Sequence, residues 1–262
     1  MDTKSLHNIH VLVTRPKELA DNLCELIKNA GGVPICYPAI EIREPVASNS
    51  REFVSHNIHA FNLAIFISPT AVMRTLRYLP TLPQNLRIAA IGSRTAETLA
   101  QAGFRTDILP DGHDSESLLA HPQMQPENIR DAHIIIFRGE GGRTLLGDTL
   151  TARGANVIYA EMYSRARPEP DTDSQQQLLR ADIVAATSNE GLLNLLEIVS
   201  DKPFLRSLPL IVPGARCEQM ARSLGFKSIV VADNATDDAT LDALIAWASQ
   251  QAGQSEAATP VR

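Results

Sequence analysis

Short runs of apolar, β-branched residues alternate with amphipathic stretches along this 262-residue chain. Some runs are apolar at every position, for example residues 64–67 and 134–137. Continuous apolar runs are expected of strands that are buried on both faces, as in parallel sheets covered by helices. The pattern predicts strands at residues 9–14, 33–37, 63–68, 87–92, 106–109, 133–138, 156–162, 183–188, 208–212 and 228–231.

Helical spacing of apolar residues fills several intervals between these strands. It predicts helices at residues 17–30, 95–102, 144–153, 218–224 and 241–247, and the first four end next to a glycine. Glycine is the expected stop because it adopts the left-handed conformation at little cost. Strand, helix, glycine and strand in succession is typical of βαβ units, so the sequence predicts an α/β fold with parallel sheets.

An internal repeat of about 120 residues runs through the chain. The aligned pairs are 10–15 with 133–138, Gly31 with Gly154, Ser68 with Ser188, 91–94 with 213–216, and 103–104 with 225–226. A period of this length is the size of a domain, so it indicates a duplication that produces two similar lobes. The alternative is that any two βαβ units share such features.

Two proline-containing segments, residues 38–45 and 160–170, follow strands and are expected to be connections. The last twelve residues, 251–262, are small and polar, and we expect them to form a frayed tail. Trp247 is the only tryptophan and is expected to lie in the core.

Composition and charge restrict the class of function. Hydrophobic residues make up 44% of the chain and charged residues 21%, which is typical of a globular protein. A net charge of −6 gives no basic field for nucleic acid, so we expect no nucleic-acid partner. No apolar run approaches the roughly 20 residues of a membrane span, and residues 1–8 lack the apolar core of a signal peptide.

The cysteines indicate a reducing compartment. Cys24, Cys36 and Cys217 are odd in number and far apart in the sequence, which argues against a disulfide framework and fits a reducing environment. We expect them to fill the core. The sequence therefore predicts a cytoplasmic protein without a membrane segment. No apolar stripe demands a partner subunit, so we expect a monomer.

Polar residues gather at the ends of predicted strands, where ligands bind in open α/β sheets. Arg15 and Arg138 end equivalent strands of the two repeats. Hydroxyl and amide side chains follow a second pair of strands, in Ser68-Pro69-Thr70 and Thr187-Ser188-Asn189. Such residues cap helices, and they leave the first helical N–H groups free to bind an anion. Capping alone is the alternative, but the occurrence in both repeats favours a shared ligand surface.

Two other patterns are weaker. The glycine-rich turn 139–142, with Glu161 about 20 residues on, suggests a dinucleotide site, but Thr144 stands where the third glycine should be. His56 and His59 have the spacing of two ligands on one helix face, yet no acidic or sulfur-bearing residue nearby completes a metal shell. We therefore expect no metal site and no cofactor.

Taken in order, several motifs resemble the uroporphyrinogen-III synthase family. They are Val-Thr-Arg-Pro at 13–16, Phe-Ile-Ser-Pro-Thr-Ala-Val at 66–72, Ile-Gly at 91–92, Phe-Arg-Gly-Glu-Gly-Gly at 137–142, Thr-Ser-Asn-Glu-Gly at 187–191 and Pro-Gly at 213–214. The resemblance covers residues 9–247, nearly the whole chain. One departure is Arg216-Cys217, where some family members carry a hydroxyl residue.

The resemblance implies two α/β lobes, each a parallel sheet flanked by helices, joined by a two-stranded linker. Lobe one would comprise residues 1–37 and 168–262, and lobe two residues 42–160. Residues 38–41 and 161–167 would form the linker strands. The chain would thus leave lobe one early and return to it late.

The resemblance also implies a reaction. The linear tetrapyrrole hydroxymethylbilane loses its hydroxyl group, and ring D attacks through its substituted carbon to give a spiro intermediate. Reclosure then yields uroporphyrinogen III with ring D inverted. The same substrate cyclises without inversion when left alone, so the enzyme must select a conformation and exclude water, for which closure of two lobes around a cleft would serve.

Site residues follow from the matched motifs. The family pattern implies substrate contacts from Ser68, Thr95, Arg138, Thr187, Ser188, Asn189 and Gly214. Pro69, Thr70 and Gly139 are included as their neighbours, and Arg15 is included for its position at a strand end. Many of these contacts would come from backbone N–H groups. Tyr163 matches the tyrosine of the family's linker and is the candidate for assisting departure of the hydroxyl group.

Two other functions remain open at this point. A nucleotide-dependent α/β enzyme would use the 139–142 turn, and a non-catalytic two-lobe binding protein would need only the duplication and a cleft. The resemblance also implies transient contact with hydroxymethylbilane synthase, the enzyme that supplies the substrate.

Overall fold

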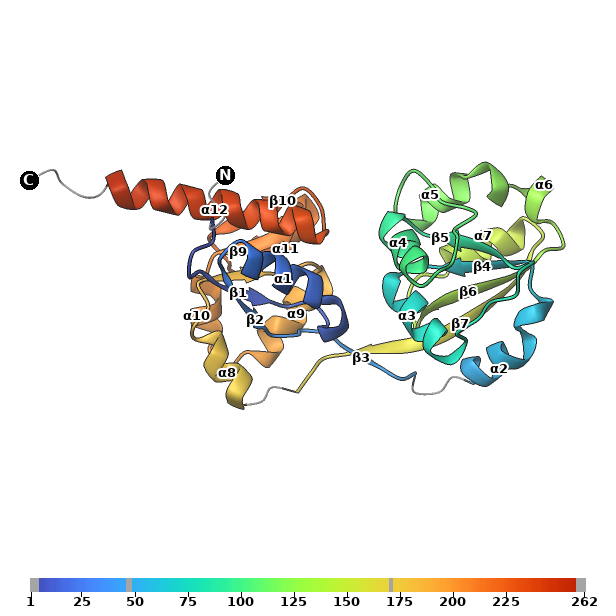
Figure 1. The fold of residues 1–262 in the computed structure, drawn as a ribbon, viewed down its shortest axis with the longest axis horizontal. Coiled ribbons are helices and arrows are strands. Elements are labelled where there is room, and N and C mark those ends of the chain that lie inside the picture. The colour runs from blue at the N-terminus through green and yellow to red at the C-terminus, as the bar shows by residue number, and fades with distance from the viewer. Residues whose placement is uncertain (1–4, 46–48, 170–171, 258–262) are drawn as a thin grey trace, which may run out of the picture. The chain divides into compact units, whose positions relative to one another are not determined.

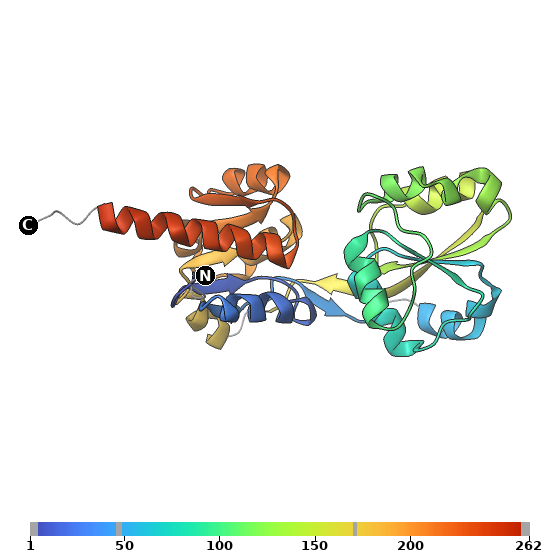
Figure 2. The same cartoon turned by 45° about the horizontal axis from the view of Figure 1, so that its top comes forward.

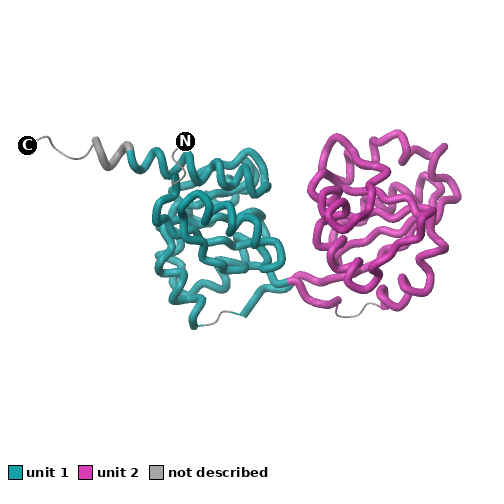
Figure 3. Tube along the Cα trace, in the orientation of Figure 1, with its two compact units in different colours: residues 1–41, 166–262 teal, residues 42–165 magenta. Residues whose placement is uncertain are grey.

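A computed structural model describes residues 5–45, 49–169 and 172–257 of the chain. The chain divides into two compact units (Figure 3). Unit 1 comprises Met1–Glu41 and Ala166–Arg262, and unit 2 comprises Ile42–Arg165. The chain therefore enters unit 2 once, near residue 41, and leaves it once, near residue 166.

Unit 1 is built on a five-stranded sheet in the order β10-β9-β8-β1-β2, and every neighbouring pair is parallel (Figure 1). Its strands are β1 (His10–Val13), β2 (Val33–Cys36), β8 (Ile183–Ala185), β9 (Leu210–Pro213) and β10 (Ile229–Ala232). The three central strands β1, β8 and β9 are almost entirely buried, as continuous apolar runs predict.

Helices cover both faces of this sheet (Figure 2). One face packs against α1 (Asp21–Asn29) and α12 (Asp237–Ala257). The other packs against α8 (Thr172–Leu178), α9 (Asn189–Ile198), α10 (Lys202–Ser207) and α11 (Ala215–Ser223). The single turn η1 (Lys17–Leu19) precedes α1, and Gly31 follows α1 with a φ of 86°, a conformation that glycine adopts at least cost.

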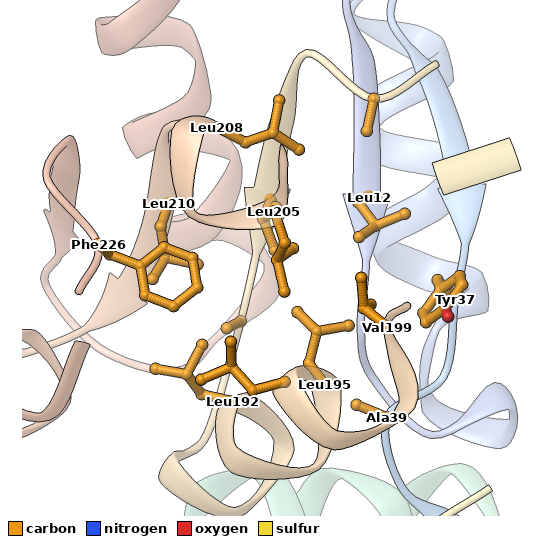
Figure 4. Packing of buried hydrophobic residues seen from close by; sticks show 14 of the residues in the cluster. Leu12, Tyr37, Ala39, Leu192, Leu195, Val199, Leu205, Leu208, Leu210 and Phe226 are labelled. Atoms are coloured by element: carbon orange, nitrogen blue, oxygen red, sulfur yellow. The ribbon is translucent and has the colours of Figure 1, made fainter. Parts of the chain in front are cut away.

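The second of these faces holds a leucine-rich core (Figure 4). Leu12 of β1 and Leu210 of β9 meet Leu192 and Leu195 of α9 there, and each of the four is fully buried. Full burial of such a side chain contributes about 1.5–3 kcal/mol, so this layer is a main source of the stability of unit 1.

Unit 2 carries the second sheet, in the order β3-β7-β6-β4-β5. The pairs β7–β6, β6–β4 and β4–β5 are parallel. Its strands are β3 (Glu41–Arg43), β4 (Leu63–Phe66), β5 (Arg87–Ala90), β6 (His133–Gly139) and β7 (Asn156–Ala166). β3 and β7 contain the two points at which the chain passes between units, and they are neighbours in this sheet.

Helices again cover both faces. One face packs against α2 (Ser50–Asn57), the turn η2 (Ile58–Ala60), α3 (Pro69–Tyr78) and α4 (Ser93–Gln101). The other packs against α5 (Ser115–Ala120), the turn η3 (Pro122–Met124), α6 (Pro126–Ile129) and α7 (Leu145–Ala152). Within the described residues, no helix combines the length and the apolarity that crossing a membrane would need. The predicted α/β class, with two similar lobes of parallel sheet flanked by helices, is confirmed.

The repeat is visible in the strand order. The aligned segments make β6 equivalent to β1, β4 to β8, and β5 to β9. The order β7-β6-β4-β5 in unit 2 then matches β2-β1-β8-β9 in unit 1. Both units therefore share one topology, although the chain begins each at a different strand.

Some predicted elements differ from the structure. Residues 106–109, the equivalent of β10, form only an isolated bridge between Ile108 and Ala89, because Pro110 follows at once and the pairing cannot extend. The apolar pattern did not predict β3 (Glu41–Arg43), since three residues carry too little periodicity. The expectation of a frayed tail is wrong for residues 251–257, which continue α12; residues 258–262 lie outside the described part. Alanine and glutamine favour the helical conformation, so they extend α12 beyond its first half, which packs on the sheet.

Leu195 and Leu193 offer a test of this packing on a single helix. Leu195→Ala is expected to destabilise unit 1 by about 2–5 kcal/mol, because it leaves a cavity in the fully buried layer. Leu193→Ala is the matched control: that side chain is 44% exposed, and the change should stay within about 0.5 kcal/mol. Urea unfolding followed by fluorescence of Trp247, the single tryptophan, reports on unit 1. Equal effects of the two substitutions would contradict the assigned core.

Candidate functional site

In each unit, two neighbouring parallel strands near the middle of the sheet are followed by helices that pack on opposite faces of the sheet. In unit 2 these strands are β4, followed by α3 on one face, and β6, followed by α7 on the other. In unit 1 they are β8, followed by α9, and β1, followed by α1. Ligands of open α/β sheets bind beyond the carboxyl ends of the strands at such a switch point. The predicted residues Arg15, Ser68, Arg138 and Ser188 all follow or end these four strands.

The switch point of unit 2 brings Ser68 and Tyr163 together. The hydroxyl of Ser68 accepts a hydrogen bond from the backbone N–H of Ala71 at 3.0 Å and so caps α3. The same oxygen lies 3.1 Å from the phenol oxygen of Tyr163. Tyr163 is only 2% exposed and packs in the core beneath α3. Its phenol is therefore held by a residue whose own orientation is fixed by a helix cap.

A register shift places Tyr163 beside Gly139. β6 and β7 pair in regular register up to Arg138 and Glu161, but the next partners are Gly139 and Tyr163. A Cβ atom on Gly139 would lie 2.7 Å from the tyrosine ring, so only glycine leaves room for it. The backbone N–H of Glu140 donates to the carbonyl of Tyr163 at 2.7 Å, which closes the contact. The bulge thus turns the tyrosine toward the tips of β4 and β6.

Arg138 is buried and is engaged by its own loop. Its Nε donates to the carbonyl of Gly139 at 3.1 Å, and its guanidinium lies 4.5 Å above the ring of Tyr159. The phenol of Tyr159 accepts from the N–H of Gly147 and donates to the carbonyl of Thr144, at the start of α7. Sequence reasoning missed this role of Tyr159, because a polar cap from a distant strand leaves no local signal.

The remaining predicted residues of unit 2 lie at the starts of α3 and α4. Pro69 is the first residue of α3, and Thr70 follows it and is buried. Thr95 lies in the first turn of α4, is also buried, and its backbone N–H bonds to Gly92 at 3.1 Å. Neither helix has an acidic residue in its first turn, so the positive ends of both helix dipoles are uncompensated there.

Unit 1 repeats the cap at the start of α9. The hydroxyl of Ser188 accepts from the N–H of Gly191 at 3.0 Å, the same geometry as Ser68 with Ala71. Thr187 and Asn189 flank it at the tip of β8, and both are half-buried. Unlike α3, helix α9 carries an acidic residue, Glu190, in its first turn. Gly214, the equivalent of Gly92, begins α11 with a φ of 84°, a left-handed conformation that glycine adopts without strain.

Arg15 is buried and forms an ion pair with the start of α12. Its Nη2 lies 2.8 Å from Oδ1 of Asp237 and donates to the carbonyl of Ala235 at 2.6 Å. Only 4% of Arg15 and 8% of Asp237 are exposed. The guanidinium therefore joins the tip of β1 to the C-terminal helix. Asp237 lies 222 positions later in the chain, and no sequence pattern linked it to Arg15.

The nucleotide interpretation finds no support in the glycine-rich turn. Oε1 of Glu161, the proposed ribose ligand, accepts from the N–H of Gly141 at 3.3 Å and lies 4.0 Å from Nε of Arg138. The carboxylate of Glu161 thus stabilises the glycine-rich turn 139–142. His56 and His59 are exposed, and the described residues contain no cluster of three or more histidine, cysteine or acidic side chains suited to a metal.

These features describe two related α/β units whose strand tips present capped helix starts and backbone N–H groups. That arrangement is typical of proteins that bind anionic small molecules. Among the described residues predicted for the site, Tyr163 is a buried side chain at such a strand tip whose phenol could donate a proton in a reaction.

Comparison with known proteins identifies the family. Residues 21–242 match the family model described as uroporphyrinogen-III synthase HemD. The chain is 33% identical over 248 residues to the uroporphyrinogen-III synthase of Escherichia coli, with 89% of this chain and 99% of the relative covered. The Salmonella typhimurium enzyme is 34% identical over 250 residues with the same coverage. This chain belongs to the uroporphyrinogen-III synthase family.

Solved structures support the fold. The structure of the Helicobacter pylori uroporphyrinogen-III synthetase matches with a TM-score of 0.63, covering 91% of this chain and 99% of that one at 16% identity. A uroporphyrinogen III synthase mutant from Thermus thermophilus matches with a TM-score of 0.56, covering 93% and 99% at 18% identity. At these identities the likeness concerns the fold alone.

The ion pair predicts that Arg15 matters first for stability. Arg15→Ala should destabilise unit 1 by about 3–5 kcal/mol, because it leaves the carboxylate of Asp237 buried without its counter-ion. Arg222→Ala is the control: it breaks an exposed pair with Glu218 and should change stability by less than about 1 kcal/mol. Urea unfolding followed by Trp247 measures both. A stable Arg15→Ala protein with a raised KM would instead assign Arg15 to the substrate.

Proposed function

We infer that this chain is a uroporphyrinogen-III synthase, a cyclising lyase that converts hydroxymethylbilane to uroporphyrinogen III. The observation that carries this conclusion is the family match over residues 21–242. It agrees with the two full-length relatives of the same name. The reaction removes the hydroxyl group as water and joins the chain ends with ring D inverted.

We propose that the helix starts of unit 2 bind carboxylate side chains of the tetrapyrrole. The first turns of α3 and α4 offer N–H groups at the positive end of a helix dipole, without a competing acidic residue. Ser68, Pro69, Thr70 and Thr95 form these turns. Binding through backbone groups allows an acidic protein to hold a polyanion without a cluster of exposed arginines.

The corresponding edge of unit 1 has a complementary role in this proposal. Thr187, Ser188 and Asn189 begin α9, and Gly214 begins α11, where its left-handed backbone leaves the surrounding space open. Each helix carries an acidic residue in its first turn, Glu190 and Glu218 respectively. These turns therefore suit the pyrrole N–H groups and neutral parts of the substrate better than its carboxylates.

We propose that the two lobes given by the family pattern, with residues 38–41 and 161–167 as linker, correspond to these two units.

Tyr163 is the proposed proton donor to the departing hydroxyl group. The hydroxyl of Ser68 holds its phenol, and the ring rests on Gly139, so little reorientation accompanies proton transfer. Arg138 and Gly139 keep the β6 tip in the shape that this requires. A phenol ionises at about pH 10, so it is a weak acid at neutral pH, and orientation of the substrate supplies most of the rate gain.

This reasoning predicts the size of the loss in Tyr163→Phe. Removing the phenol should lower kcat by about tenfold to a few hundredfold, within the range of acid–base contributions. Tyr78→Phe is the matched control, because that phenol is exposed and bonds to Glu44, and kcat should be unchanged. Stopped-time assays of macrocycle formation measure both. A loss far above a thousandfold in Tyr163→Phe would contradict an account in which positioning dominates.

The function itself is tested by the identity of the product. Purified protein given freshly generated hydroxymethylbilane should yield the type III isomer with no added cofactor, whereas substrate alone yields type I. Chromatographic separation of the two isomers decides the outcome. A type I product at the spontaneous rate would contradict the synthase function, and a rise in melting temperature with NAD(P) would favour the nucleotide-dependent alternative.

We further propose that the protein acts in the cytoplasm as a monomer, with hydroxymethylbilane synthase as its transient partner. The reason for proposing this partner is that hydroxymethylbilane is short-lived: in solution it cyclises spontaneously to the type I isomer, and direct transfer between the two enzymes would shorten its time in solution. No cofactor is needed for a dehydrating cyclisation that transfers only a proton and a hydroxyl group.

A further inference from the structure

Two cysteines that are separated in the sequence meet in unit 1. Sγ of Cys24, on α1, lies 3.2 Å from Sγ of Cys36, the last residue of β2. The expectation that the three cysteines fill the core holds for Cys24, which belongs to a buried cluster, and is wrong for Cys36, which is exposed. Cys24 is buried and Cys36 is exposed, so one sulfur of the pair can meet solutes and the other cannot.

The geometry is close to that of a disulfide. A disulfide bond is about 2.05 Å long, so the two sulfurs need to approach by only about 1.1 Å. α1 and β2 are joined by the short turn that contains Gly31 and Gly32, and the helix packs against the strand.

The surroundings activate one sulfur. A hydrogen bond from Cys24 lowers the pKa of the Cys36 thiol to about 6; burial and Asp21 oppose this shift, whereas Lys28 and Lys17 add to it. The same hydrogen bond, together with burial, raises the pKa of Cys24, which therefore keeps its proton. An exposed thiolate beside a protonated thiol is the arrangement of an attacking and a resolving cysteine.

We propose that Cys24 and Cys36 form a reversible thiol-oxidation site, in which the Cys36 thiolate attacks a peroxide and Cys24 resolves the product into a disulfide. The Cys36 thiolate attacks one oxygen of hydrogen peroxide, which breaks the O–O bond and leaves a sulfenic acid and, after protonation, water. The Cys24 sulfur then attacks the sulfenic sulfur, its proton leaves with the hydroxyl as a second water, and the S–S bond forms. Two thiols are oxidised and one peroxide is reduced; a dithiol reductant reverses the change.

Cys217 provides a control within the same unit. It is a buried cysteine on α11, and burial raises the pKa of its thiol. It belongs to the core layer on the opposite face of the sheet from Cys24. It is therefore expected to stay reduced under mild oxidation.

The test uses the reduced full-length protein and hydrogen peroxide in small excess. Free thiols counted after denaturation should fall from three to one, and intact mass should drop by two hydrogens. Peptide mapping should show Cys24 linked to Cys36, and dithiothreitol should restore all three thiols. Cys217→Ser should form the same disulfide. Cys24→Ser should instead leave a Cys36 sulfenic acid that dimedone labels. Over-oxidation of Cys36 without a Cys24–Cys36 link in the wild type would overturn the proposal.

A second measurement needs no variant and so does not depend on how a substitution folds. The rate of iodoacetamide alkylation of Cys36 in the native protein should level off above about pH 7, whereas an ordinary cysteine keeps rising to about pH 8.5. Mass spectrometry of the labelled peptides follows each cysteine separately. If Cys36 titrates like an ordinary cysteine, or if Cys24 is alkylated first, the assignment of the attacking sulfur is overturned.

Discussion

The arrangement of each unit depends on two adjacent parallel strands whose following helices pack on opposite faces of the sheet. In each unit, adjacent strands end at the same edge while the helices that follow them pass to opposite faces of the sheet. The loops after these strands therefore cannot cover one another, and their N–H groups stay at the edge. Ser68 and Ser188 each satisfy one such group by capping a helix, in matching geometry.

The two units share this arrangement of strands and helices, but the side chains at their strand ends have different roles. The two strand-end arginines occupy equivalent positions, and both are buried, but Arg138 supports its own loop whereas Arg15 pairs with a helix from the far end of the chain. In unit 2, β7 continues past the register shift beside Gly139 and places Tyr163 against the capping Ser68. Its equivalent in unit 1, β2, ends at Cys36, and the phenol of the buried Tyr37 that follows accepts a hydrogen bond from Gln175. The two edges thus share their backbone chemistry and differ in the side chain that can take part in a reaction.

Sequence reasoning reached the fold class and almost all strands, because buried parallel strands are apolar without interruption. It also reached the helix caps of Ser68 and Ser188, since caps are local signals, and a motif match singled out Tyr163 as a candidate. It could not reach the contacts that depend on three-dimensional closure. The partner of Arg15 lies on α12, the cap of α7 comes from Tyr159 on a later strand, and the contact between Cys24 and Cys36 depends on how a helix packs on its strand. Residues 106–109 show the opposite limit: the apolar signal was present, but Pro110 confines the pairing to a single bridge between Ile108 and Ala89.

The discontinuity of unit 1 has a consequence for biosynthesis. Unit 2 is one continuous segment, so every strand of its core exists once the ribosome has passed residue 165. Unit 1 needs β1 and β2 from the beginning of the chain and β8, β9 and β10 from its last third. Domains generally fold as units during synthesis. The inserted unit is therefore free to fold first, while the apolar strands β1 and β2 remain without the other three strands of their sheet until the segment after unit 2 has been made.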